Sequence, residues 1–303
     1  MDKKRNLIRN FYQCLTTWSS LRRYPGLFSL PDAALNWKEV LLPRRFSYRA
    51  AGRDLARTTR IEKVSDGVSK VTVLENGLVF YWLGEVSNNL YFSIAQEFDP
   101  LYPHYYTTPP VRMTPESLVL DVGSCEGLFA YRILKQGQAR KVICFEPSER
   151  TANYTRLGAE TNGLSDKIVV ETLAVGRISG PVNFLEGDSP EANRIDLNSS
   201  ATGGRTIMAV SLDDYCAEKK INLTERDLIK IDAEGADVDI LKGAERLIRG
   251  GSPQIAITTY HDERHVFEMV DWLKQVQPAY RLRLKGFFFW GGSPRPVLLQ
   301  AAL

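Results

Sequence analysis

Cysteine and histidine are scarce in this sequence of 303 residues, which contains four cysteines and three histidines. The cysteines are far apart, and no two of them form a C-x-x-C pair or a cluster with histidine; they are Cys14, Cys125, Cys144 and Cys216. This spacing argues against a zinc site and against a disulfide framework, so we expect no metal among the site residues. Four thiols with such spacing fit a reducing compartment.

Long apolar runs are also missing. No stretch approaches the roughly 18–20 uninterrupted apolar residues that span a bilayer. Lys3, Lys4 and Arg5 resemble the start of a signal peptide, but Arg9 interrupts the apolar segment that should follow, and no small-residue cleavage site comes after it. With 44% hydrophobic and 25% charged residues, the composition is that of a folded domain and not of a disordered or membrane chain. We therefore expect a cytoplasmic protein with no transmembrane segment.

Positive charge is concentrated near the N-terminus, where residues 1–60 hold 13 Lys/Arg against 4 Asp/Glu. Leu7, Phe11, Leu15 and Trp18 recur at helical spacing, which predicts a basic amphipathic helix over residues 3–23. Such a helix can lie on a membrane surface as a peripheral contact. It more often packs on its own domain or on a second subunit, so a homo-oligomer stays open. The basic block as a whole is most simply a solvated face.

Residues 1–110 are expected to form an N-terminal extension, because the pattern changes at Pro109-Pro110. Alternating apolar residues on both sides of Asn76-Gly77 predict a β-hairpin within residues 64–84. The aromatic-rich segment from Tyr91 to Tyr106 contains two prolines and is expected to be irregular. It could close over a site as a lid.

Residues 111–303 alternate between apolar runs and helical patterns, which predicts one further domain. The expected strands are 118–121, 142–146, 168–175, 228–232, 255–259, 280–284 and 296–301, and the expected helices are 128–136, 149–161, 212–219, 237–248 and 263–275. Residues 182–185 and 206–210 look like an inserted hairpin. Such alternation predicts an α/β, Rossmann-like fold, a parallel sheet with helices on both faces. The last two strands, which have no helix between them, are expected to be antiparallel.

A glycine turn follows the first of these strands, in Asp121-Val-Gly-Ser-Cys-Glu-Gly127. Ligands of open parallel sheets bind beyond the carboxyl ends of the strands. Gly123 permits a tight turn there, and Gly127 opens a helix whose N–H groups favour a negatively charged ligand group. The spacing is G-x-x-x-G and not G-x-G-x-x-G, which disfavours a dinucleotide. Glu146 ends the next strand, where a carboxylate can accept hydrogen bonds from both hydroxyls of an adenosine ribose.

Carboxylates also follow the central strand, in Ile229-Lys-Ile-Asp-Ala-Glu-Gly-Ala-Asp237. Asp232 and Glu234 should face the same crevice as Asp121, because the carboxyl ends of parallel strands share one edge. Asp232 could instead cap the following helix, and the two roles can coexist. Asp232, Glu234 and Asp237 could form a carboxylate cluster, although acidic residues at this spacing after a strand are more often cap and salt-bridge residues.

The order and spacing of several short motifs resemble the FkbM family of S-adenosylmethionine-dependent methyltransferases. They are Asp121-Val-Gly-x-x-x-Gly127, Phe145-Glu-Pro147, Leu173-Ala-Val-Gly176, Ser211-Leu-Asp-Asp214, the block from Ile229 to Asp237, and Leu241-Lys-Gly-Ala244. The resemblance implies the seven-stranded class I methyltransferase fold, with S-adenosyl-L-methionine as cofactor. It places Asp121, Gly123, Ser124 and Gly127 at the methionine end, Glu146 and Pro147 at the ribose, Ala174 near the adenine, and Asp232 near the methionine end and the acceptor.

Methyl transfer to a hydroxyl requires an aligned nucleophile, exclusion of water and removal of a proton. His261 lies just beyond the fifth expected strand, and we assign it as general base or acceptor contact, with Glu234 as a second catalytic candidate. Tyr260 and His104 are candidates for contact with the substrate. His261 could instead be a hydrogen-bonded loop histidine.

The resemblance suggests an oxygen acceptor, such as a hydroxyl of a sugar, a glycolipid or a secondary metabolite. Many relatives place a glutamate before the histidine, whereas this chain has Ile257-Thr-Thr-Tyr-His261. That departure leaves open a non-catalytic or regulatory protein of the same fold. A nucleic-acid substrate is disfavoured because the sequence has no Asn-Pro-Pro-Tyr-type motif that would hold a flipped base.

Overall fold

The computed structural model describes residues 48–185, 187, 194–196, 204–262, 264–288 and 295–303, together with Tyr12, Leu15, Thr16, Ser19 and Leu27. The basic helix expected over residues 3–23 lies almost entirely outside these residues, and its role stays a prediction. Among the helices that the structure describes, none is long and apolar enough to cross a membrane.

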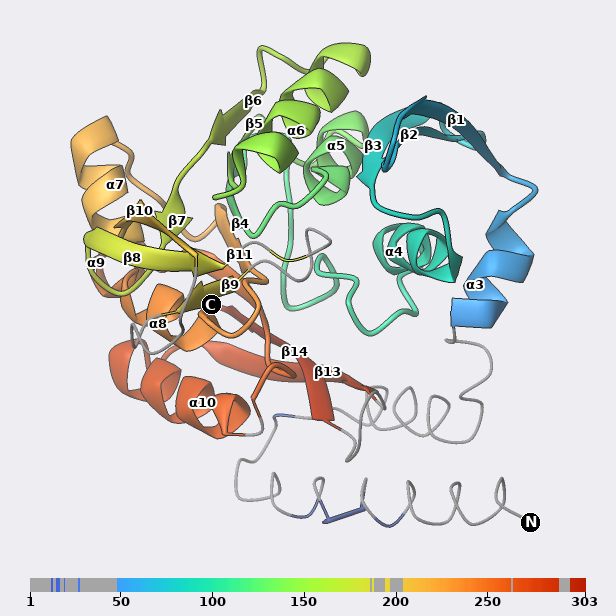
Figure 1. Ribbon diagram of the computed structural model, residues 1–303. Helices are drawn as coiled ribbons and strands as arrows, with labels where there is room; N and C mark the ends of the chain where they lie inside the picture. The colour runs from blue at the N-terminus through green and yellow to red at the C-terminus, as the bar shows by residue number, and fades with distance from the viewer. Residues whose placement is uncertain are drawn as a thin grey trace.

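A seven-stranded sheet forms the centre of the molecule (Figure 1). In spatial order its strands are β13 (Arg281–Phe288), β14 (Arg295–Ala302), β12 (Gln254–Thr258), β11 (Leu228–Ile231), β4 (Leu118–Val122), β5 (Lys141–Phe145) and β6 (Ile168–Glu171). Only β14 runs against the others, pairing antiparallel with both β12 and β13. The predicted α/β fold with a seven-stranded sheet and an antiparallel final pair is confirmed.

Both faces of the sheet are covered, which explains why the central strands β4, β5, β11 and β12 are mostly apolar. Leu118, Leu120 and Val122 of β4 enter one core cluster, and Val119 enters the other. This alternation follows from the period of two of a β-strand. One face carries α5 (Leu128–Lys135) and α6 (Glu149–Thr161). The other carries α7 (Leu212–Lys219), α8 (Asp237–Lys242), α9 (Glu245–Gly251) and α10 (His265–Val276).

The N-terminal part contains α3 (Tyr48–Leu55), a three-stranded antiparallel sheet and α4 (Asn88–Phe98). The expected hairpin is present as β2 (Val68–Val73) and β3 (Leu78–Leu83), joined by a four-residue loop, and β1 (Thr59–Ser65) adds a strand beside β2. The expectation of an irregular segment from Tyr91 onwards was wrong for α4. Its prolines begin only after the helix ends, and Ser87 caps its N-terminus by accepting from the Asn89 N–H.

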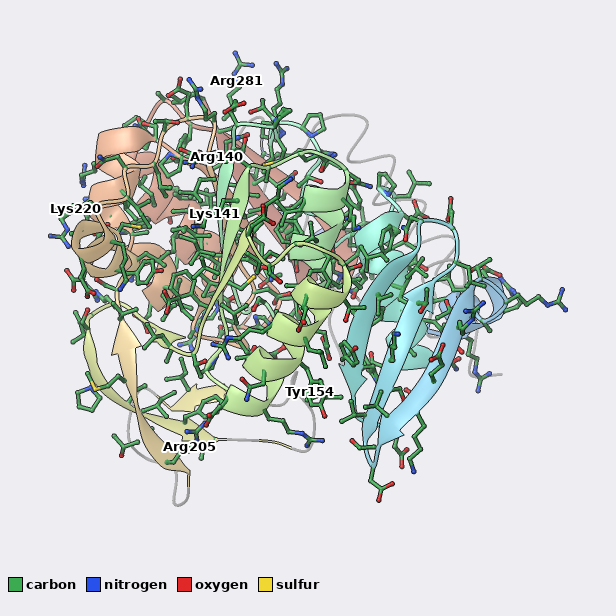
Figure 2. All side chains as sticks on the ribbon, turned by 90° about the horizontal axis from the view of Figure 1, so that it is seen from above. Arg140, Lys141, Tyr154, Arg205, Lys220 and Arg281 are labelled. Atoms are coloured by element: carbon green, nitrogen blue, oxygen red, sulfur yellow. The ribbon has the colours of Figure 1, made fainter. Side chains whose placement is uncertain are left out.

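This N-terminal part packs on the helical face formed by α5 and α6. The Asn162 side chain accepts from the Val79 N–H at 3.0 Å and donates to the Val79 carbonyl at 2.6 Å. Tyr154 of α6 faces the three-stranded sheet, and its ring centroid lies 5.7 Å from that of Tyr81 (Figure 2). One core cluster includes residues on both sides of Pro109-Pro110. The division into residues 1–110 and 111–303 stays a prediction.

A small second sheet is inserted between β6 and α7. Its strands lie in the order β7 (Ala174–Val175), β10 (Arg205–Val210), β8 (Gly180–Leu185) and β9 (Arg194–Asp196). The expected antiparallel pairing of residues 182–185 with 206–210 is confirmed. The single strand expected over 168–175 was wrong, because β6 ends at Glu171 and β7 pairs with β10 in the inserted sheet.

The single helix expected over residues 237–248 is two helices, α8 and α9, separated at Gly243. The chain after β7 passes so close that a Cβ on Gly243 would overlap the carbonyl oxygen of Gly176. The Gly243 carbonyl accepts from the Asp213 N–H at 2.9 Å instead of continuing a helix. A contact between distant segments therefore overrides the local helical pattern.

Candidate active site

The ends of β4, β5, β11 and β12 converge where the strand order reverses between β4 and β11. Open α/β sheets form their ligand crevice at this point. Gly123 follows β4 with a φ of +74°, and a Cβ there would overlap the carbonyl oxygen of Asp232. Only glycine lets these two strand ends approach so closely.

Asp121 forms a buried ion pair with Lys230 beneath this turn. The Lys230 Nζ lies 2.9 Å from Asp121 Oδ1 and donates to the Gly123 carbonyl at 2.7 Å. Burial raises the pKa of the Asp121 carboxyl, and the adjacent Lys230 ammonium opposes that shift. Burial opposes the charge of Lys230, but Asp121 and Asp232 outweigh it and raise its pKa. Asp121 lines neither of the two cavities at this edge of the sheet. It supports the glycine turn indirectly, through its ion pair with Lys230.

A small cavity opens in front of Gly123 and Glu146. It encloses about 50 Å³ and is also lined by Cys125, Pro147 and Asp232. Phe184 and Ile195 of the inserted sheet also line this space.

Glu146 is buried at the edge of this cavity and accepts from the Ser148 N–H at 2.9 Å. Burial raises the pKa of its carboxyl to about 7, although hydrogen bonds from the Ser148 and Cys125 backbones oppose the shift. Pro147 lines the cavity beside it. The glycine turn and this carboxyl fit the adenosyl group that the sequence suggested.

Two other residues assigned to the cofactor lie away from the cavity wall. Ala174 is fully buried, and its neighbours Leu173 and Val175 line the cavity. Gly127 begins α5 with a φ of +76°, and a Cβ there would lie 2.7 Å from side-chain atoms of Tyr131 and Thr155. Gly127 therefore serves close packing of α5 against α6.

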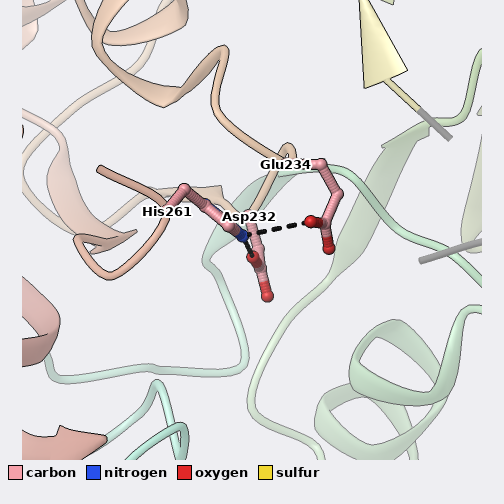
Figure 3. A group of neighbouring side chains, drawn as sticks. All are labelled: Asp232, Glu234 and His261. Carbon is pink, nitrogen blue, oxygen red and sulfur yellow. Dashed lines mark ion pairs between the residues drawn. The ribbon is translucent and has the colours of Figure 1, made fainter. Parts of the chain in front are cut away.

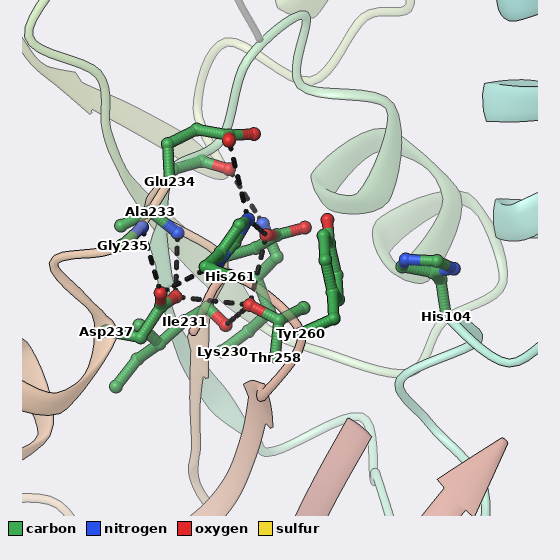
Figure 4. Close-up of polar contacts among 12 residues, drawn as sticks. His104, Lys230, Ile231, Ala233, Glu234, Gly235, Asp237, Thr258, Tyr260 and His261 are labelled. Carbon is green, nitrogen blue, oxygen red and sulfur yellow. Dashed lines mark hydrogen bonds and ion pairs between the residues drawn. The ribbon is translucent and has the colours of Figure 1, made fainter. Parts of the chain in front are cut away.

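Asp232, Glu234 and His261 meet beyond the ends of β11 and β12 (Figure 3). The His261 Nε2 lies 3.4 Å from a Glu234 oxygen and 3.7 Å from an Asp232 oxygen. On its other side, the His261 Nδ1 lies 2.8 Å from Oδ2 of the fully buried Asp237 (Figure 4). The structure thus brings together the two predicted catalytic residues and the predicted acceptor-side aspartate.

These carboxylates determine the charge of the imidazole. Burial opposes protonation of His261, but Asp237, Glu234 and Asp232 outweigh it and raise its pKa to about 11. An imidazole that is already protonated at neutral pH cannot accept a proton. The raised pKa therefore favours the assignment of His261 as an acceptor contact over its assignment as general base.

A larger cavity of about 390 Å³ adjoins this group and separates it from the N-terminal part. Its wall on the sheet side includes Ser124, Asp232, Glu234 and Tyr260. The Tyr260 ring stands between the rings of His261 and His104, with centroid distances of 4.3 and 5.2 Å (Figure 4). Both predicted substrate contacts, Tyr260 and His104, thus line this cavity.

His104 comes from the aromatic segment of residues 91–106, one interpretation of which was a lid. Its Nδ1 lies 2.7 Å from Nε2 of Gln96, and burial lowers the pKa of the imidazole to about 4. His104 is therefore neutral at physiological pH and is suited to hydrogen bonding within the wall.

Several contributors to the site were missed by sequence reasoning. Tyr106 donates to Asp232 Oδ2 at 2.7 Å, and Thr258 donates to Asp232 Oδ1 at 3.1 Å. The wall opposite the carboxylates includes side chains from β3 and α4, namely Phe80, Trp82, Asn89, Phe92, Ser93 and Gln96. Lys230 stood within a quoted motif. The signal for part of this wall was the aromatic-rich segment of residues 91–106, one interpretation of which was a lid, whereas Phe80, Trp82 and Asn89 precede that segment.

The sheet order, the antiparallel β14, the glycine turn and the buried glutamate at the next strand end define a class I methyltransferase fold. A sequence model described as the methyltransferase FkbM domain matches residues 121–282, more than half of the chain. The chain therefore belongs to the FkbM methyltransferase family, as the sequence motifs suggested. S-adenosylmethionine is its cofactor.

Two individual proteins align with this chain at low sequence identity. The chain is 27% identical over 166 residues to the 2-O-methyltransferase NoeI of Sinorhizobium fredii, covering 49% of this chain and 65% of NoeI. It is 24% identical over 192 residues to the AMB antimetabolite synthetase AmbE of Pseudomonas aeruginosa, covering 52% of this chain and 9% of AmbE. The chain thus spans less than two thirds of each of these relatives.

Among solved structures, the methyltransferase FkbM from Methylobacillus flagellatus aligns with a TM-score of 0.47 and 19% identity, covering 70% of this chain and 52% of that chain. The O-methyltransferase from Bacillus cereus, in complex with S-adenosylhomocysteine, aligns with a TM-score of 0.38 and 14% identity, covering 62% of this chain and 75% of that chain.

Proposed function

We propose that this chain transfers the methyl group of S-adenosylmethionine to a hydroxyl oxygen of a sugar, a glycolipid or another secondary metabolite. The observation that carries the proposal is the cavity of about 390 Å³ between the carboxylates and the N-terminal wall. The wall combines aromatic rings with amide and hydroxyl groups, a mixture that suits a small polyhydroxylated acceptor. The name of NoeI, a 2-O-methyltransferase, also supports an oxygen acceptor.

Residues around the two cavities would hold the reactants. Gly123 and Ser124 would contact the methionine end of the cofactor, and Glu146 would accept the ribose hydroxyls. Glu234 and Asp232 line both cavities, so they lie where the transferred group would pass from one cavity to the other. Closure of this junction by Tyr260 and the N-terminal wall would exclude water.

The bound cofactor supplies a methyl group activated by its sulfonium. Because His261 is already protonated, we assign proton removal to Glu234 and hydrogen bonding to the acceptor oxygen to His261. The acceptor O–H bond breaks with its proton passing to the Glu234 carboxylate. The methyl group would then pass to this oxygen, and the donor would leave as its neutral thioether, S-adenosylhomocysteine.

His261→Ala tests this assignment. We expect turnover to fall roughly 10²–10⁴-fold, because the acceptor oxygen loses its oriented contact, while affinity for S-adenosylhomocysteine stays unchanged. The measurement is transfer of a labelled methyl group to a panel of mono- and oligosaccharides, with mass spectrometry of the product. His265→Ala, on the first residue of α10, is the matched control. Unchanged turnover in His261→Ala would remove this residue from the mechanism, and products methylated only on nitrogen or sulfur would refute an oxygen acceptor.

A further inference from the structure

The group formed by Asp232, Glu234 and His261 has the geometry of a cation site. Each residue offers one ligand atom, and these three atoms lie within 4.8 Å of one another (Figure 3). A divalent ion bound about 2.0–2.2 Å from each atom requires distances below that limit. The three residues come from two adjacent strand ends, because Asp232 and Glu234 follow β11 whereas His261 follows β12.

The orientation of His261 provides an independent observation. Its side chain is only 9% exposed, and its buried Nε2 faces Glu234 at 3.4 Å and Asp232 at 3.7 Å without a closer polar partner. The Nδ1 faces the fully buried Asp237, whose carboxylate also accepts from the Ala233 and Gly235 N–H groups. A carboxylate behind a histidine fixes the ring and directs its second nitrogen at a metal. Asp237 thus directs the Nε2 toward Asp232 and Glu234.

The hydrogen bonds and charges around Asp232 also fit a cation site. Asp232 Oδ2 accepts a hydrogen bond from Tyr106, and the Thr258 hydroxyl lies 3.1 Å from both Asp232 Oδ1 and Asp237 Oδ1. The nearby Lys230 is engaged with Asp121 and the Gly123 carbonyl. When ionised, Asp232 and Glu234 together carry a charge of −2. A divalent cation would balance this charge once the His261 Nε2 has released its proton.

We propose that Asp232, Glu234 and the Nε2 of His261 bind one divalent cation of the Mg²⁺/Mn²⁺ class. Carboxylate oxygens suit both ions, and the single imidazole favours Mn²⁺ over Mg²⁺. The cation would take the place of the imidazole proton. The consequence of the cation for catalysis rests on the proposed function. An acceptor hydroxyl bound to the cation would become more acidic, and the hydroxyl proton would pass to the Glu234 oxygen that does not bind the ion.

Binding is tested directly with Mn²⁺. The untagged full chain is treated with EDTA, dialysed and titrated with Mn²⁺, and free Mn²⁺ is followed by electron paramagnetic resonance. We expect about one saturable site, and a thermal midpoint that rises with Mn²⁺ concentration because the ion binds the folded state. Glu234→Gln and His261→Gln should each weaken binding at least ~10-fold, since each removes one ligand.

Glu225→Gln is the matched control, because Glu225 is an exposed carboxylate beside the opposite ends of the strands. It should bind Mn²⁺ like the unaltered chain. Glu234 is 38% exposed, so its variant is expected to fold even if the His261 variant does not. No saturable site, or equal affinity in Glu234→Gln and the unaltered chain, would overturn the proposal.

The binding assay contains neither methyl donor nor acceptor, so it is separable from the proposed function. Saturable Mn²⁺ binding that depends on Glu234, together with no methylation of any hydroxyl acceptor, would refute the function and keep the cation site. Methylation by the EDTA-treated chain without Mn²⁺ binding would refute the site and keep the function.

Discussion

Glu146 is a buried carboxyl that changes its charge near neutral pH, since burial raises its pKa to about 7. Ribose hydroxyls donate more strongly to a carboxylate than to a neutral carboxyl. Binding of the cofactor should therefore favour the ionised form and release a proton when the pH lies below about 7. The burial of the Glu146 side chain should therefore make the affinity for the cofactor depend on pH.

We expect affinity for S-adenosylhomocysteine to be constant above about pH 8 and to fall as the pH drops through 7, by up to about tenfold per unit. Isothermal titration calorimetry in buffers of different ionisation enthalpy measures both the affinity and the released proton. In Glu146→Gln the affinity should be lower and its dependence on pH near 7 lost. The same pH dependence in this variant would contradict the assignment of Glu146 to the ribose.

Some site residues could be predicted from the sequence because their chemistry is encoded in a short motif. Gly123 and Glu146 belong to this group, since each follows a recognisable strand. Tyr106 could not be predicted in the same way, because it reaches Asp232 across 126 positions in the chain. Its contribution depends on tertiary packing, which no local pattern records.

Elements were predictable where one local signal dominated, as for the alternating strands and helices of the central sheet. The failures have physical causes at particular positions. The Ser87 cap outweighs an aromatic-rich composition in α4, and the approach of Gly176 to Gly243 divides α8 from α9. In each case the deciding contact was a hydrogen bond or a close approach that composition and periodicity do not report.

α4 is the element that we expect to determine the size of the acceptor. Its Ser93 lines the larger cavity and donates to the Asn89 carbonyl of the same helix. Ser93→Phe should fill part of that cavity, raise KM for the acceptor at least ~10-fold and leave S-adenosylhomocysteine affinity unchanged. Steady-state kinetics and calorimetry measure the two effects separately. Ser65→Phe, at the exposed end of β1, is the control. Equal KM values in the two variants would show that α4 does not border the acceptor.

At the scale of the whole molecule, the N-terminal part and the sheet domain share a hydrophobic core. Phe80 and Trp82 of β3 belong to the same buried cluster as Phe129 and Ile133 of α5. The polar contact between Asn162 and Val79 connects the same two parts. Because the apolar surface of each part is buried by the other, neither is expected to unfold first.

We therefore expect one cooperative thermal transition, with a calorimetric enthalpy close to the van't Hoff value. Asn162→Leu leaves the Val79 N–H and carbonyl without their partner, which should cost about 1–3 kcal/mol of unfolding free energy. Differential scanning calorimetry should show a lower midpoint for this variant but still a single peak, because the shared apolar core remains. Two separate peaks in the unaltered chain would instead show that residues 1–110 and 111–303 unfold independently. The wall of the acceptor cavity would then be able to detach while the cofactor half stays folded.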